Sequence, residues 1–237
     1  MTANVHGALL AGLLAVPATS WAARRPAKAK TPPALPQVEG IARVADSVHF
    51  TLRGKAGRDD DDRLLLEVLE EEYKLLSAAL PAKTVVILHR DEAGFRAATG
   101  APAHLLAQWV GERLETVPSA RLRDGQNLRA NVRLALSRRW AEELSGGKGP
   151  PWLLAGVSVW RARLAESEAG WLDAPSLPAP GRPPMTPRES GRIIAAMAGR
   201  FGPRSVEALL RSVAAGAPAE DALRDHGGVA LTEGRRE

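Results

Sequence analysis

The stretch "NLRANVRLALSRRWAEELSGGKGPPWLLAGVSVWRARLAE", residues 127–166, predicts two helices joined by a Gly/Pro turn. Glycines 146 and 147 favour the end of the first helix, and prolines 150 and 151 favour the start of the second. We expect Asp124 to cap the first helix. Apolar residues recur at every fourth position of this helix, which indicates a buried face. They are Leu128, Val132, Leu136, Trp140 and Leu144.

Upstream, residues 41–120 alternate between strand and helix signals. Residues 41–53 indicate one strand, in which Val48, Phe50 and Leu52 alternate with polar neighbours. The segments "KTVVILHR", "DEAGFRAATG" and "LAQWVGERLETVPS" predict a buried strand, a short helix and a hairpin that turns at Gly111–Glu112. Between the first two strands, Asp59–Asp62 are predicted to lie at the N-terminus of a long helix with one apolar face, because carboxylates are favoured at that end of a helix. That face consists of Leu65, Leu69, Tyr73, Leu76 and Leu80.

The chain from residue 124 onward is predicted to be helical, apart from a Pro-rich loop at 170–187. Thr186 and Glu189 form a predicted capping box, with proline at the first helical position. Short helices should follow at about 188–200, 203–215 and 218–225. The order of elements predicts an α+β fold, with a small mixed sheet covered by helices in the N-terminal half and a helical C-terminal half.

The amino-acid composition excludes some kinds of catalytic and metal site. The chain has 237 residues, a formal charge of +5 and no cysteine, so thiol catalysis and Cys-ligated zinc are excluded. Acidic and basic residues are interleaved, which favours a mixed solvated surface over a site for nucleic acid.

The first 22 residues resemble an export signal, because a short apolar core precedes the small-x-small sequence Ser20-Trp21-Ala22. We therefore expect cleavage near Ala22 and a periplasmic or secreted protein with no transmembrane segment in the mature chain. Residues 23–40 are expected to form a Pro/Ala-rich linker. Residues 41–228 are expected to form one domain, with an α/β part at 41–120 and a helical part at 124–228. Residues 229–237 are expected to form a disordered tail.

Four segments in this order resemble the peptidase-MA-like, gluzincin-type metallopeptidases of bacteria. They are "VHFTLRG", "TVVILHRDEAGFRAATGAP", "LSGGKGPPWLLAGVSVW" and "RFGPRSVEALLRSVAAGAPAEDALRD", and the likeness covers about residues 46–226. The resemblance implies a zincin-like fold. It also implies a zinc ion held by an H-E-x-x-H helix and by a glutamate of the following helix.

At the positions that the resemblance assigns to this chemistry, the chain has other residues. The two histidine positions fall on Leu134 and Arg138, the general-base position on Ala135 and the third-ligand position on Ala155. No histidine occurs between His104 and His226. We therefore expect neither zinc nor any other cofactor and no H-E-x-x-H catalysis, and we interpret the remaining histidines as surface or partly buried residues.

Arg138 allows two interpretations. In the first, its side chain turns outward and apolar residues fill the position of the lost zinc site. In the second, it lines a residual cleft and anchors a peptide carboxylate or another anion. Glu142 lies three residues from Arg139 and four from Arg138, spacings at which ion pairs form on a helix. The candidate binding residues are Arg138, Trp109 and Glu112.

The expectation for function is an exported pseudopeptidase that binds a peptide, a protein or a cell-wall component and is not an enzyme. A metallopeptidase or other hydrolase with an unrecognised site is one alternative, and a basic helical nucleic-acid-binding protein is the other.

Overall fold

The computed structural model describes residues 43–54, 59–76, 83–102, 104–124, 128–163 and 185–227. The predicted signal segment, linker and C-terminal tail lie outside the described residues, as does nearly all of the Pro-rich loop.

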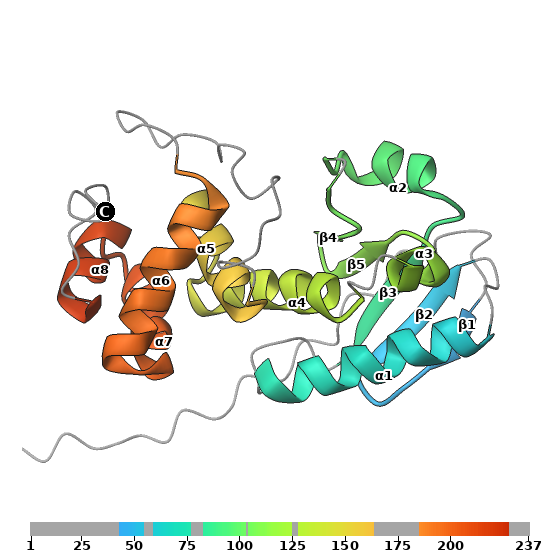
Figure 1. Cartoon of the computed structure of the whole chain (residues 1–237), viewed down its shortest axis with the longest axis horizontal. Helices are drawn as coiled ribbons and strands as arrows, with labels where there is room; N and C mark the ends of the chain where they lie inside the picture. Colours follow the sequence, from blue (N-terminus) through green and yellow to red (C-terminus); the bar gives the residue numbers. More distant parts are fainter. Residues whose placement is uncertain are drawn as a thin grey trace, which may run out of the picture. The chain divides into compact units, whose positions relative to one another are not determined.

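The N-terminal half contains one five-stranded mixed sheet in the order β1-β2-β3-β5-β4 (Figure 1). The strands are β1 (Arg43–Asp46), β2 (Phe50–Gly54), β3 (Thr84–Leu88), β4 (Ala107–Val110) and β5 (Arg113–Thr116). The three central strands run parallel, and each outer strand is antiparallel to its neighbour. Every residue of β3 is buried, as its continuous apolar run predicts.

Three helices belong to this half: α1 (Asp59–Leu76), α2 (Glu92–Thr99) and α3 (Ser119–Asp124). Helix α1 lies along the sheet and buries Leu65, Leu69 and Leu76, as its periodicity predicts (Figure 1). Asp91 caps α2 by accepting a hydrogen bond from the Gly94 amide at 2.8 Å. The mixture of helices with a small mixed sheet in this half, expected from the sequence, is confirmed.

The C-terminal half is helical, as predicted. Its helices are α4 (Leu128–Leu144), α5 (Pro151–Arg161), α6 (Pro187–Phe201), α7 (Pro203–Ala214) and α8 (Ala219–Gly227). Pro150 caps α5 and Pro151 opens it, and the Thr186–Glu189 capping box is present at α6. Leu128, Val132, Leu136 and Trp140 are buried, so the predicted face of α4 is the core face.

Two local predictions are wrong. Residues 41–53 contain a turn between β1 and β2, and Val48 in that turn is 75% exposed, whereas Phe50 and Leu52 are fully buried. Asp124 is the last residue of α3 and does not cap α4. The aspartates at 59–62 form the first turn of α1, as predicted, and Asp62 accepts a hydrogen bond from the Ser119 hydroxyl at the start of α3.

A buried carboxylate joins the two halves of the described chain. Glu72 of α1 is 1% exposed and accepts two hydrogen bonds from Arg133 of α4, at 2.6 and 2.7 Å, and one from Arg129 at 3.0 Å. Burial raises the pKa of Glu72, but the hydrogen bonds and charges of the two arginines outweigh it, so the pKa lies below its ordinary value. Beside this cluster, the Arg161 guanidinium of α5 lies over the Trp140 ring and donates to the Leu75 carbonyl.

Candidate functional site

The four positions that the resemblance assigns to zinc chemistry lie on two helices that pack against each other, α4 and α5. Ala135 is buried, and Leu134, Arg138 and Ala155 are half-buried. Leucine, alanine and arginine side chains offer no metal ligand, so these positions do not fit the zinc ion that the resemblance implies. In the described parts of the chain, no group of three histidine, aspartate or glutamate side chains is arranged to hold a metal ion.

Arg138 is paired on its own helix. Its Nε donates to Glu142 Oε1 at 2.8 Å, and the arginine side chain is 38% exposed. The predicted pair between residues four apart is thus confirmed. Glu143, not Glu142, is the helix partner of Arg139.

The two other candidate binding residues, Trp109 and Glu112, meet Arg139 instead of Arg138. Arg139 Nη2 lies 3.0 Å from both carboxylate oxygens of Glu112, and the guanidinium lies 5.3 Å from the centre of a Trp109 ring. The Trp109 indole N–H donates to the Ala135 carbonyl at 2.9 Å. These contacts fix the β4–β5 hairpin on α4, directly over the position that the resemblance assigns to the general base.

Strand β4 is an edge of the sheet, and half of its main-chain groups face away from β5. The two-residue turn makes Val110 and Arg113 a hydrogen-bonded pair. The main-chain N–H and C=O groups of Gln108 and Leu106 therefore also point toward β5. By the same alternation, the N–H and C=O groups of Ala107 and Trp109 point outward. No hydrogen bond within the described ranges takes up these four groups. An extended peptide could pair with them as an added strand.

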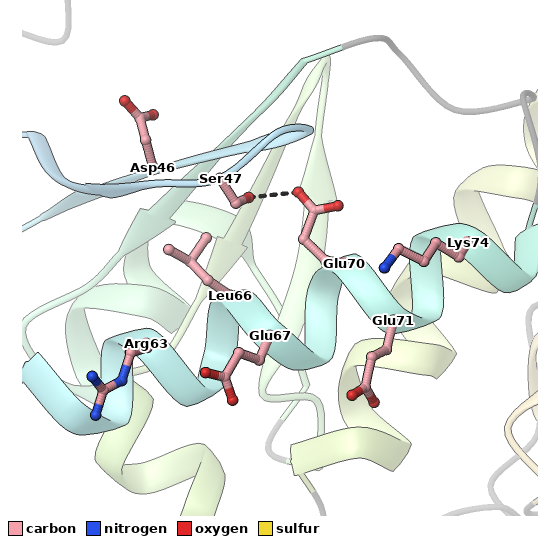
Figure 2. Close-up of a pocket in the computed structure, with 8 residues that line it drawn as sticks. All are labelled: Asp46, Ser47, Arg63, Leu66, Glu67, Glu70, Glu71 and Lys74. Carbon is pink, nitrogen blue, oxygen red and sulfur yellow. Dashed lines mark hydrogen bonds between the residues drawn. The ribbon is translucent and has the colours of Figure 1, made fainter.

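A second concave region, which the sequence did not indicate, lies between α1 and the β1–β2 turn (Figure 2). It is an open pocket of about 390 Å³, lined by acidic residues with Arg63 and Lys74 among them. Glu70 points toward the turn and accepts hydrogen bonds from the Ser47 hydroxyl at 2.6 Å and from the His49 amide at 2.7 Å. Glu67 and Glu71 point away from the turn.

The His49 ring also contacts Glu70, with 2.6 Å between Nδ1 and Oε2, and stacks on Tyr73. Burial raises the pKa of Glu70, but the hydrogen bonds from His49 and Ser47 more than offset it, so the pKa lies below its ordinary value. Since one carboxylate satisfies three donors of the turn, we interpret this cluster as a structural attachment of the β1–β2 turn to α1.

The other three histidines outside the N-terminal segment are half-buried, as predicted. His89 Nε2 lies 2.6 Å from a carboxylate oxygen of the buried Glu115, which Arg113 also contacts. Burial lowers the pKa of His104. His226 Nε2 of α8 lies 2.7 Å from the Ser212 hydroxyl of α7, a pair of serine and histidine that the sequence analysis missed because 14 residues separate them.

No helix within the described ranges is both long and apolar enough to cross a membrane. Comparison of the chain with family models, with curated proteins and with solved structures finds no match.

Proposed function

We propose that this chain is an exported, non-catalytic domain with a peptidase-like fold, and that it binds extended peptide segments along β4. The observation that carries the proposal is that β4 is the outer strand of the sheet and lies beside α4. Two residues of this strand present unused main-chain donors and acceptors, and the strand is held on α4 through Trp109 and Arg139.

Loss of catalysis is the other part of the proposal. The resemblance requires three zinc ligands and a general base, whereas the chain has Leu134, Ala135, Arg138 and Ala155 at those positions. A bound peptide would therefore be retained instead of cleaved. Main-chain pairing requires an extended peptide backbone but does not depend on the identity of the side chains. We therefore expect peptides of varied sequence as ligands.

Replacing Ala107 with proline tests the strand edge. Proline removes an outward N–H but no bond to β5, and its ring obstructs an added strand, so the sheet should survive. We expect peptide affinity to fall about tenfold, by loss of one main-chain hydrogen bond together with the obstruction. The measurement is fluorescence anisotropy with a labelled peptide selected from a Pro-free library.

The matched control is Ala107→Gly, which keeps the N–H and should leave the affinity nearly unchanged. Two further peptides are N-methylated, one at its odd-numbered and the other at its even-numbered residues. One of them should bind weakly and the other normally, because only alternate amides of a paired peptide face β4. Equal affinities for the two variants and for both methylated peptides would place the peptide elsewhere on the protein.

A serine hydrolase is a second candidate, favoured by the contact between Ser212 and His226. At 2.7 Å, the imidazole could take the hydroxyl proton while the serine oxygen attacks an ester carbonyl, and could return it to the leaving alcohol. Within the described contacts, no carboxylate orients the His226 ring, whereas an orienting group is usual in such sites. For this reason the hydrolase is the weaker candidate.

A fluorophosphonate reagent distinguishes the two candidates. If the pair is only a contact between α7 and α8, we expect no adduct at Ser212 by mass spectrometry, and no difference from Ser205, whose hydroxyl donates to the Gly202 carbonyl. An adduct at Ser212 that disappears in His226→Ala would overturn the assignment as a non-catalytic domain.

A further inference from the structure

Helices α6 and α7 carry an unbalanced positive charge. Together they contain five arginines against two glutamates. One of the glutamates, Glu189, is engaged in the capping box of α6. Helix α1 has the opposite composition, with eight acidic residues against two basic ones. The excess charge on α6 and α7 is therefore opposite in sign to that on α1.

Four of these arginines are exposed and, within the residues that the structure describes, form no ion pair: Arg192, Arg200, Arg204 and Arg211. This is unlike most other arginines of the described chain. Those at positions 113, 123 and 133, for example, all contact carboxylates. Unpaired like charges on neighbouring turns destabilise a helix slightly. The four arginines therefore stabilise the fold no better than a surface of mixed charge would.

An aromatic ring lies at the centre of this basic surface. Helix α6 ends at Phe201, and α7 begins after the single residue Gly202, whose φ of 82° favours glycine. We call Arg200, Phe201, Gly202 and Arg204 the basic corner. Phe201 is 47% exposed, and the Arg200 guanidinium lies 5.1 Å from the centre of its ring. Helices α6 and α7 contact each other and are joined at this corner (Figure 1).

The remaining two arginines lie on the same two helices, farther from the corner. Arg192 precedes Arg200 by eight residues on α6, and Arg211 follows Arg204 by seven on α7, which corresponds to rises of about 12 and 10 Å. Both are exposed. The positive charges thus flank one exposed aromatic side chain along the two helices.

We propose that the basic corner is a docking surface for an anionic lipid bilayer, a function separate from the peptide binding proposed for β4. Guanidinium groups attract anionic headgroups, and an aromatic ring inserts at the headgroup level of a bilayer. Single-stranded nucleic acid fits less well, because it calls for successive aromatic side chains along a groove. Phe201 is the only exposed aromatic residue among those described.

The test is vesicle sedimentation of the full-length protein. Vesicles of equal parts phosphatidylglycerol and phosphatidylcholine should retain the protein, and added salt should release it. Replacing Arg200 and Arg204 with glutamine should weaken the partition coefficient about 25-fold, since each arginine near the surface contributes about fivefold. Phe201→Ala should weaken it by a smaller factor that salt does not change.

The matched control is Arg63→Gln with Arg90→Gln, which makes the same change in net charge at exposed arginines of the sheet half. It should bind anionic vesicles nearly as well as the natural chain. Three results would each overturn the proposal: no binding to anionic vesicles, equal binding to pure phosphatidylcholine, or equal losses in the corner variant and the control. Retention on single-stranded DNA but not on vesicles, lost in the corner variant, would reassign the surface to nucleic acid. None of these results depends on peptide binding at β4.

Discussion

Replacing Glu72 with glutamine is expected to lower the free energy of unfolding by about 3 kcal/mol, at the low end of the range for breaking a buried ion pair. Glutamine keeps the shape but leaves Arg133, 21% exposed, without its counter-charge. Arg129 is half-exposed and can turn toward water, which limits the loss. Urea denaturation followed by circular dichroism measures the effect as a lower transition midpoint.

Glu71→Gln is the matched control, because Glu71 is the next residue, contacts the same Arg129 and is 55% exposed. Its loss should be below about 1 kcal/mol, as for other surface ion pairs. Equal losses in the two variants would mean that burial of the Glu72 carboxylate contributes nothing.

The same contact makes stability depend on pH. The pKa of Glu72 is lower in the folded chain than its ordinary value of 4.5. The folded chain therefore binds fewer protons than the unfolded chain, and this stabilisation is fully present above that value. It should be lost as the pH falls through the lower pKa of the folded state. In Glu72→Gln the acid transition should be shallower than in the natural chain.

Replacing Gly156 with alanine is expected to cost about 3 kcal/mol, at the upper end for overpacking. A methyl group at this position would lie 2.8 Å from the Cβ and the carbonyl oxygen of Ser190 on α6, and 2.9 Å from its carbonyl carbon. Two of the clashing atoms are main-chain atoms, so α5 and α6 would have to separate along a contact that buries Leu153, Val157 and Ile194. The midpoint of thermal or urea unfolding provides the measurement.

Gly199→Ala is the control on α6 itself. Nothing lies within 4 Å of the added methyl group, so the variant should be more stable by about 0.5–1 kcal/mol, because alanine loses less chain entropy in a helix. The two substitutions should thus change stability in opposite directions. Destabilisation by both to the same extent would contradict the close approach of α5 and α6 as the cause.

The sequence predicts those elements whose cause is local. The capping box needs only Thr186 and Glu189, three residues apart, and the hairpin needs only a two-residue turn between apolar segments. The buried face of α4 follows from its spacing of four. Helix α3 was missed because its six residues include too few apolar positions to show a period.

The contacts of the candidate site depend on which element packs beside α4, and the sequence leaves this open. Arg138 and Arg139 differ by about 100° around the helix axis, and only the docked hairpin shows that Arg139 faces Trp109 and Glu112. The Glu72 cluster was missed for a related reason. Its partners lie 57 and 61 residues away in the chain, and no local pattern in the sequence connects them.

The two edges of the sheet are protected unequally. The register of strand β1 shifts between Arg43 and Ala45, and the strand ends in the charged residue Asp46, both of which discourage association with another strand. Strand β4, "AQWV", is regular and uncharged. In a concentrated solution without ligand, two copies should pair through β4. Storage at high protein concentration should therefore favour a dimer that grows no further, because only the protected β1 edges remain, and a bound peptide should keep the protein monomeric.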